Sequence, residues 1–388
     1  MDAIRVEELA LQRKRYAHLT DDEFRFMLQQ VDGRQRTREK LPSFAEIEDW
    51  WYPVRLSCEQ CSSELTARYK AEHTTQCGEY SILIDLTGGY GVDTFFMSEH
   101  VAEAHYVERN EELCRIAKHN FGLTRPHVEV HNTNAEEFLA KHENKLEDAL
   151  IFIDPARRDA HGGKVFKIED CEPNVIELLP VLKRAKKLVI KLSPMLDITA
   201  ALRSLEMSFD VHIVAIKNEV KEVLLIENND SGSTYATNIV NSSKSDENNN
   251  QTFNFKTEEE HDSKCLIYSS ANAHLTQHGN YIYEPNAAII KSGAFKLVGE
   301  RYGLCKMGVN THLYLAKDYV TEFPGRVWEI VETNCIDTKG ISANVMTRNY
   351  PITADQLRKK LKVKDSDTHT IIGARLGEKP TLFLCKRV

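Results

Sequence analysis

The sequence of 388 residues lacks the features of a membrane protein or a secreted protein. No stretch approaches the ~20 consecutive apolar residues that a transmembrane helix needs. The first residues, Met1 to Leu9, include charged side chains where a secretory signal requires an apolar segment. The nine cysteines are scattered and odd in number, which favours reduced thiols over a framework of disulfides. We therefore expect a cytoplasmic protein with no membrane partner.

The sequence also lacks a convincing internal repeat and the composition of a disordered chain. Hydrophobic residues make up 41% of the chain and charged residues 28%, which is typical of a soluble globular protein. At ~150 residues per domain, the length predicts two or three domains.

The net charge of −8 is unevenly distributed along the chain. The segment from Lys339 to Val388 has eleven Lys and Arg against four Asp and Glu, a net charge of +7, so the rest of the chain carries −15. A basic C-terminal module on an acidic body suggests a partner with a phosphate backbone. A solvated charged surface explains the same charge equally well.

The pattern of the first 75 or so residues is helical. Thr20 precedes three acidic residues, as at the start of a helix. Ser57 has the spacing of a capping box, which predicts a helix from there through Ala71.

Short apolar segments alternate with helical segments from Tyr80 onward, which predicts a parallel, doubly wound α/β sheet. The expected strands are Ser81–Asp85, Ala104–Glu108, Val128–Val130, Ala149–Asp154 and Lys187–Leu192. The expected helices between them are Glu111–Asn120, Ala135–His142 and Asn174–Lys186. Two further strands, Val211–Lys217 and Val220–Glu227, predict an antiparallel hairpin that closes the sheet.

The segment from Glu227 to Asp262 differs in composition, with eight Asn, five Ser and eight acidic residues against two Lys. We expect a disordered or loosely ordered linker there. After it, small α+β modules are expected, with strands at Lys264–Ser269, Tyr281–Tyr283, Asn344–Arg348 and Thr381–Lys386 and a helix at Ala354–Leu361.

The strongest motif is a glycine-rich turn after the first apolar strand, Ile82-Leu-Ile-Asp85-Leu-Thr-Gly88-Gly89-Tyr-Gly91. Glycines at a strand-to-helix turn let a ligand approach the backbone, and the helix N-terminus offers free N–H groups. A dinucleotide fold requires a third glycine where this chain has Thr94. The acid four residues before Gly89 instead resembles the D-x-x-x-G-x-G turn of class I S-adenosylmethionine-dependent methyltransferases. A plain tight turn in another α/β fold remains the alternative.

Two further positions fit the same interpretation. Glu108 ends the second strand, where a carboxylate can accept hydrogen bonds from both ribose hydroxyls. Asn134 follows the third strand, where the methyltransferase pattern has an Asp beside the adenine, so this position departs from the pattern.

The fourth strand ends in Asp154-Pro155-Ala-Arg157-Arg158. An Asp-Pro pair at this place resembles motifs of nucleic-acid methyltransferases, although Arg157 stands where amine methyltransferases have an aromatic residue. The RNA 5-methyluridine enzymes have a nucleophilic Cys after the fifth strand, where this chain has Ser193. Serine is a much weaker nucleophile than a thiolate, so we exclude that covalent mechanism. A simple helix cap is the alternative role of Asp154.

Basic residues crowd the loop after this motif. Ligands bind at strand C-termini in open α/β sheets, so the loop faces the substrate in this fold. A basic loop there favours a phosphate-bearing substrate, and charge balance against nearby acids is the alternative. The basic residues are Arg157, Arg158, His161, Lys164 and Lys167.

Cys58 and Cys61, with His73 and Cys77 after them, have tolerable zinc-ligand spacing. Because the pair falls in the first turn of the expected helix, with no turn-forming glycine, we expect no metal.

Five segments in order make the whole chain resemble bacterial class I methyltransferase-like proteins with a ferredoxin-like segment and a C-terminal THUMP-like domain. They are Leu56-Ser-Cys-Glu-Gln-Cys-Ser-Ser-Glu64, the Asp85 turn, Asp154-Pro-Ala-Arg-Arg158, Tyr283-Glu-Pro-Asn286 and the tail Arg348–Val388. The resemblance implies a Rossmann-like methyltransferase core, an N-terminal helical region and small C-terminal α+β domains. The expected boundaries are 1–76 for the helical region, 77–227 for the methyltransferase domain, 228–262 for the acidic linker, 263–330 for the ferredoxin-like segment and 331–388 for the THUMP-like domain.

THUMP domains bind RNA, so the resemblance implies an S-adenosylmethionine-dependent methyltransferase that acts on tRNA or rRNA without a covalent intermediate. A non-catalytic RNA-binding protein and a methyltransferase for small molecules or proteins are the alternatives. The expected catalytic residues are Asp154, Pro155 and Arg157. The expected cofactor-binding residues are Asp85, Gly89, Gly91, Glu108 and Asn134. The expected RNA-binding residues are Arg158, Lys164, Arg358, Lys359 and Lys360.

Overall fold

A computed structural model describes residues 6–76, 80–157, 167–228, 232–240, 250–334, 342–366 and 368–388. The chain forms two compact units: Met1–Phe209 with Val223–Asp230, and Asp210–Glu222 with Ser231–Val388. Among the described residues, none of the helices is both long and apolar enough to cross a membrane. The five domain boundaries expected from the sequence stay predictions.

The N-terminal region is helical, as expected. Thr20 caps its longest helix with a capping box shared with Glu23. The single helix predicted from Ser57 to Ala71 is wrong, because the chain turns to an extended conformation at Cys61 and a new helix begins after Ser63, whose hydroxyl accepts a hydrogen bond from the Thr66 N–H. The helices are α1 (Val6–Ala10), η1 (Arg13–Tyr16), α2 (Asp21–Thr37), α3 (Pro42–Glu46), α4 (Arg55–Gln60) and α5 (Glu64–His73).

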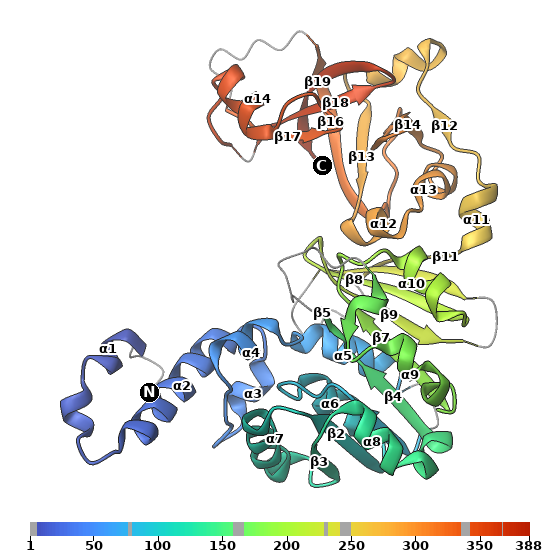
Figure 1. Cartoon of the computed structure of the whole chain (residues 1–388). Helices are drawn as coiled ribbons and strands as arrows, with labels where there is room; N and C mark the ends of the chain where they lie inside the picture. Colours follow the sequence, from blue (N-terminus) through green and yellow to red (C-terminus); the bar gives the residue numbers. More distant parts are fainter. Residues whose placement is uncertain are drawn as a thin grey trace. The chain divides into compact units, whose positions relative to one another are not determined.

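The core of the first unit contains the five predicted parallel strands (Figure 1). They are β1 (Ile82–Asp85), β2 (Glu103–Glu108), β3 (Val128–Asn132), β4 (Ala149–Ile153) and β7 (Lys187–Leu192). Their order in the sheet is β3-β2-β1-β4-β7. β1 and β4 are central and buried because their side chains are apolar on both faces, which suits parallel strands covered by helices.

Helices alternate with these strands, and α7 packs on β3 while α8 packs on β2. The sheet thus has the doubly wound α/β arrangement that the alternating pattern predicted. The helices are α6 (Val92–Met97), η2 (Ser98–His100), α7 (Glu111–Thr124), α8 (Ala135–Lys141), η3 (Glu143–Asp148), η4 (Ile168–Asp170), α9 (Val175–Leu182) and α10 (Ile198–Leu205). A separate two-stranded sheet pairs β5 (Ala156–Arg157) with β6 (Cys171–Glu172).

The predicted hairpin is formed by β8 (Phe209–Ile216) and β9 (Glu219–Glu227). Both turn residues, Lys217 and Asn218, have positive φ, the conformation of a type I′ turn. β9 pairs antiparallel with β7, so the order continues β7-β9-β8.

The hairpin does not close the sheet, and the expectation of a loosely ordered linker between Glu227 and Asp262 is wrong for the described part of that segment. β10 (Ser233–Ile239) pairs parallel with β8, and β11 (Gln251–Lys256) pairs antiparallel with β10. Phe253 and Phe255 are buried and alternate with exposed polar residues. The helix α11 (Thr257–Asp262) follows. Two aromatic residues at strand spacing supply the apolar surface that the Asn-rich composition conceals.

A sheet of eight strands lies in the second unit, in the order β12-β14-β15-β13-β16-β19-β18-β17. The predicted strand Asn344–Arg348 and helix Ala354–Leu361 are found with those bounds, as β17 and α14. The other strands are β12 (Leu266–Ile267), β13 (Tyr281–Pro285), β14 (Cys305–Gly308), β15 (Thr311–Ala316), β16 (Gly325–Thr333), β18 (Thr370–Leu376) and β19 (Lys379–Arg387). The other helices are η6 (Ser270–Thr276), α12 (Ala287–Ser292) and α13 (Phe295–Arg301).

Candidate functional site

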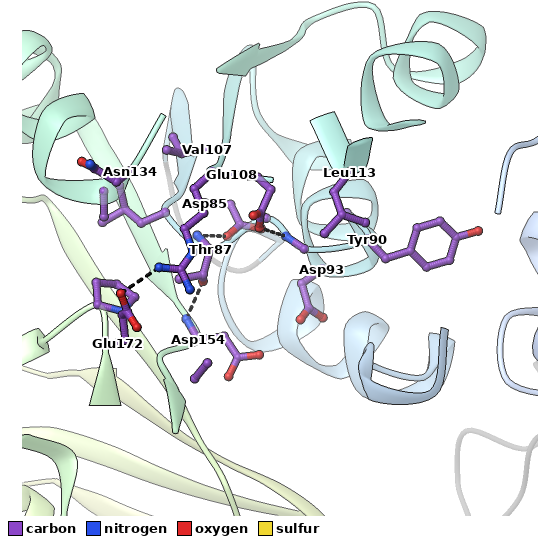
Figure 2. Close-up of a pocket in the computed structure, with 18 of the residues that line it drawn as sticks. Asp85, Thr87, Tyr90, Asp93, Val107, Glu108, Leu113, Asn134, Asp154 and Glu172 are labelled. Atoms are coloured by element: carbon purple, nitrogen blue, oxygen red, sulfur yellow. Dashed lines mark hydrogen bonds and ion pairs between the residues drawn. The ribbon is translucent and has the colours of Figure 1, made fainter. Parts of the chain in front are cut away.

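A pocket of roughly 650 Å³ lies in the first unit where β1, β2, β3, β4 and β7 end (Figure 2). Open α/β sheets bind ligands at this edge, because the loops that follow the strands leave a crevice there. Its lining includes the glycine-rich turn, residues that end or follow the strands, and residues of the α4–α5 connection such as Ser62. The site is therefore built from chain segments that are far apart in sequence.

The glycine-rich turn has the geometry that its sequence predicts. Gly89 and Gly91 have φ values of +54° and +84°, which side chains other than glycine rarely adopt. A Cβ atom on Gly91 would lie 2.9 Å from the Phe121 ring, and one on Gly88 would overlap the Tyr106 ring at 2.2 Å. The turn is thus tight, and the rings of Tyr106 and Phe121 pack directly against its backbone.

Asp85 lies at the end of β1 and is almost completely buried. Its Oδ1 accepts a hydrogen bond from the Thr87 N–H at 3.0 Å, and its Oδ2 accepts one from the Thr94 hydroxyl at 2.5 Å. Burial raises the pKa of Asp85 to about 7, against the opposite effect of these two hydrogen bonds. Thr94, the residue that departs from the dinucleotide pattern, therefore serves as a hydrogen-bond donor to Asp85 across the turn.

Glu108, at the end of β2, also binds the glycine-rich turn. One of its carboxylate oxygens, Oε2, accepts a hydrogen bond from the Gly89 N–H at 3.0 Å, and Oε1 accepts one from the Asn110 N–H at 2.8 Å. Figure 2 shows Glu108 and Asp85 on the same side of the pocket. Two of the five residues predicted to bind the cofactor, Asp85 and Glu108, are thus brought together on neighbouring strands.

Asn134 lines the pocket, but its side-chain oxygen caps α8 by accepting the Glu137 N–H at 2.8 Å. Asn132, which we had not predicted, lines the same wall at the end of β3. Its amide donates to the backbone oxygens of Glu108 and Arg109, both at 3.1 Å. Two asparagines therefore line this wall of the pocket, Asn132 at the end of β3 and Asn134 at the start of α8, whereas only Asn134 was predicted.

Asp154 follows β4 and is part of a charged network that we had not predicted. Lys191, on the neighbouring strand β7, has its Nζ 2.5 Å from Asp154 Oδ2 and 3.5 Å from Asp93 Oδ2. Asp93, in the first turn of α6, also lies 3.2 Å from the Nζ of Lys70, which is completely buried. Ser62 donates to Asp93 at 2.7 Å. Two aspartates and two lysines thus share one partly enclosed cluster.

The charges in this cluster stabilise one another. Burial alone raises the pKa of Asp93, but Lys70 and Lys191 outweigh it and hold that pKa below its ordinary value. Because Asp93 is ionised and paired with two lysines, the Lys191 ammonium remains in the pocket beside Asp154.

The other predicted catalytic residues of the first unit are Pro155 and Arg157. Pro155 is buried. The backbone of Arg157 pairs with Cys171 in the small sheet. Arg158 and Lys164 lie outside the described residues, as does His161.

Of the residues with zinc-ligand spacing, Cys77 lies outside the described part of the chain, and Cys58, Cys61 and His73 do not form a group of converging ligand atoms. The Cys58 thiol donates to the Pro53 carbonyl and the Cys61 thiol to the Cys58 carbonyl. Burial raises the pKa of Cys58 to about 12, which disfavours the thiolate that zinc requires.

The predicted RNA-binding residues of the second unit lie on α14. Lys359 and Lys360 are exposed. Arg358 is half-buried and forms an ion pair with Asp365 at 2.9 Å. Leu357 anchors the helix in a small core with Ile371 and Leu384. Lys359 and Lys360 are therefore more accessible to a partner than Arg358.

Comparison with known proteins bears on the fold and on the class of protein. Residues 281–324 match a ferredoxin-like domain family, and residues 325–387 match a THUMP domain-like family. The crystal structure of a putative methyltransferase from Porphyromonas gingivalis W83 is 29% identical, with a TM-score of 0.82, and the match covers 100% of this chain and 99% of that one. An uncharacterized S-adenosylmethionine-dependent methyltransferase of Mycobacterium tuberculosis (strain H37Rv) is 20% identical over 347 residues, which cover 85% of this chain and 88% of the relative.

These findings confirm the predicted resemblance and the α/β fold with small C-terminal sheet domains. They also support the predicted enzyme class and cofactor. The individual site residues remain predictions. Lys191, Lys70, Asp93 and Ser62 were missed because no motif marks them.

Proposed function

We propose that this S-adenosylmethionine-dependent methyltransferase methylates RNA, with tRNA or rRNA as its substrate. The observation that carries the proposal is the presence, in one chain, of a methyltransferase pocket and a THUMP domain-like segment whose helix α14 exposes Lys359 and Lys360. Lysines on an exposed surface attract a phosphate backbone. A cytoplasmic location remains an expectation.

The residues of the pocket fit the cofactor. A Cβ atom on Gly89 would meet only the Thr87 carbonyl, at 3.8 Å, so the backbone of the turn can approach a ligand closely there. Glu108 lies where a carboxylate can accept hydrogen bonds from a ribose. Asp85 shapes the turn beneath the methionine portion, and Asn132 and Asn134 line the adenine side. When bound, S-adenosylmethionine supplies a methyl group on a positively charged sulfur.

The chain's own contribution is to hold the acceptor group in line with that methyl. Asp154 lies in the pocket with one oxygen bound to Lys191. The other oxygen, Oδ1, is the atom we assign to accept a hydrogen bond from the acceptor group of the RNA. Positioning of this kind lowers the barrier because it removes the entropy cost of bringing two reactants together. Pro155 and Arg157 follow Asp154 directly in the chain, and the Arg157 side chain lies outside the described part of the structure.

The proposed mechanism has no covalent enzyme–RNA intermediate. Ser193 follows β7 where a cysteine nucleophile would be needed. The serine hydroxyl is a poor nucleophile without a neighbouring base to activate it.

The test compares modified nucleosides in total RNA from a strain lacking the gene and from the same strain complemented with the wild type or with Asp154→Asn. We expect one methylated nucleoside to disappear on deletion, to return with the wild type and to stay absent with Asp154→Asn. In parallel, purified protein is incubated with labelled S-adenosylmethionine and RNA, protein or small-molecule fractions from the deletion strain. Label confined to protein or small molecules would overturn the RNA assignment. Cofactor binding without transfer to any fraction would indicate a non-catalytic RNA-binding protein.

A further inference from the structure

A second cluster of chemically active side chains lies on β2 and β3, outside the lining of the cofactor pocket. His105 and Glu129 are register partners on these adjacent parallel strands. His131 lies two residues beyond Glu129 on β3. Because side chains alternate along a strand, Glu129 and His131 project from the same face of the sheet as His105.

The donor atoms of these residues converge. His105 Nδ1 lies 2.9 Å from His131 Nε2. Glu129 Oε2 lies 3.6 Å from His105 Nδ1 and 3.7 Å from His131 Nε2. The ligands of a tetrahedral zinc ion, with bonds of about 2.0–2.2 Å, lie about 3.3–3.6 Å apart. The two separations that involve Glu129 are close to this spacing, whereas the two imidazole nitrogens lie at hydrogen-bond distance and would have to move apart by about 0.5 Å to bind one ion.

A second carboxylate orients the buried imidazole. His105 Nε2 lies 2.8 Å from Glu103 Oε1, and Lys145 binds the same carboxylate oxygen. Lys145 Nζ also lies 3.3 Å from His105 Nε2. In the tautomer that donates Nε2–H to Glu103, the lone pair of Nδ1 faces His131 and Glu129. Histidines that bind metals commonly donate their other N–H to a carboxylate in this way, and the carboxylate fixes the tautomer.

The exposed fractions of the His105 and Glu129 side chains also fit a metal site. His105 is 1% exposed, so its imidazole is held within the fold beside the other two donors. The side chain of Glu129 is 65% exposed, which leaves an open side for an ion to enter. Neutral imidazole and a carboxylate are ordinary zinc ligands.

We propose that His105 Nδ1, His131 Nε2 and Glu129 Oε2 bind one divalent zinc ion, with water as the fourth ligand. The ion would join the edge strand β3 to β2, and hence fix the strand end from which Asn132 and Asn134 project. The alternative is a hydrogen-bonded pair of neutral histidines with a solvated glutamate. This inference does not depend on the proposed function.

The test measures zinc binding by full-length protein that has been freed of metal with a chelator. Competition with a chromogenic chelator gives the affinity, and native mass spectrometry gives the number of ions. We expect one zinc ion per chain and a rise in melting temperature on adding zinc, since a ligand that binds the folded state stabilises it. Cobalt in place of zinc should give the visible absorption bands of a tetrahedral site.

Glu129→Gln and His131→Gln should each weaken zinc binding by at least tenfold and remove the rise in melting temperature. Glu129 is the safer variant because its side chain is mostly exposed. Glu103→Gln, a change in a positioning residue, should weaken binding by about 10–100-fold. Glu111→Gln, an exposed glutamate on α7, and Cys61→Ser are matched controls that should leave zinc binding unchanged. Wild-type binding no tighter than that of Glu129→Gln would overturn the proposal, as would loss of binding in Cys61→Ser.

Discussion

Lys191 and Asp154 join the ends of two neighbouring parallel strands, with Nζ 2.5 Å from Oδ2. The Lys191 side chain is 13% exposed and also contacts Asp93 and Ser62. Because the lysine is held by three partners, the Asp154 carboxylate is fixed relative to the glycine-rich turn. The pair is the part of the pocket best placed to control the position of an acceptor group.

Asp154→Asn should reduce methyl transfer by about 10²-fold or more, the usual contribution of a positioned acid or base. The amide preserves size but changes one oxygen to a donor and removes the charge that pairs with Lys191. Single-turnover rates with saturating cofactor measure the effect. Calorimetry with S-adenosylmethionine supplies the control, because its affinity should fall much less than the rate. An unchanged rate would remove Asp154 from the reaction.

Glu108→Ala should weaken S-adenosylmethionine binding by about 1–3 kcal/mol, the cost of leaving polar groups unpaired. Part of this cost arises from the Gly89 N–H, which loses its acceptor in the variant. Calorimetry on Glu108→Ala and on the exposed control Glu111→Gln measures the difference. Binding of NAD by the wild type, with no binding of S-adenosylmethionine, would contradict the cofactor assignment itself.

Asp85 should make the stability of the folded protein depend on pH. Its pKa is about 7 in the folded state and 3.8 ordinarily, so between these values the folded state retains a proton that the unfolded state has lost. The free energy of unfolding should therefore fall as the pH rises from about 4 to 7, by at most roughly 1.4 kcal/mol for each pH unit.

Urea unfolding without cofactor at several pH values measures this slope. Asp85→Asn keeps an acceptor for Thr94 and cannot titrate, so it should flatten the decrease relative to the wild type. Equal slopes in the two proteins would show that Asp85 stays ionised in the folded state.

Reversal of Lys359 and Lys360 to Glu should weaken RNA binding and leave cofactor affinity unchanged. Arg358 is left unchanged in this variant, because its ion pair with Asp365 also stabilises the end of α14. Loss of two phosphate contacts should flatten the log–log dependence of affinity on salt by about 1.4, at about 0.7 for each single-stranded contact. Lys14→Glu with Lys118→Glu, two exposed lysines of the first unit, is the matched control. Equal affinity of the Lys359/Lys360 variant and the wild type would show that α14 is only a solvated surface.

RNA containing 5-fluorouridine should form no stable adduct with the protein. The expectation follows from Ser193, whose hydroxyl replaces the thiolate that such trapping requires. Denaturing electrophoresis with and without S-adenosylmethionine detects a crosslinked band. A cofactor-dependent band that Cys171→Ser abolishes would restore a cysteine mechanism.

The fold was predictable where local pattern and tertiary structure agree. α14 has the expected bounds because Thr353 caps the helix with a capping box shared with Gln356. β17 also has the expected bounds, although Val345 is its only buried residue. The prediction missed β10 and β11 because it gave more weight to the Asn-rich, acidic composition of this segment than to the alternation of apolar and polar residues around Phe253 and Phe255. The helix predicted from Ser57 to Ala71 failed because the Ser63 cap competes with the earlier capping-box spacing.

The candidate site was predictable only where a motif is continuous in sequence. The turn from Asp85 to Gly91 can be recognised by its spacing. Nothing in the local sequence distinguishes Lys191 from other lysines. Only the pairing of β4 with β7 brings it to Asp154. The histidine cluster was missed for the same reason, since His105 and Glu129 meet only because β2 and β3 are adjacent.

The assembly of the pocket from distant segments has a consequence for the order of events during synthesis. Ser62 and Lys70 leave the ribosome long before Lys191, yet all three surround Asp93. A nascent chain that ends before β7 contains only one of the two lysines that pair with Asp93, and it lacks Lys191 in the lining of the pocket. The cluster around Asp93 is therefore complete only after residue 191 has been synthesised, more than a hundred residues after Lys70.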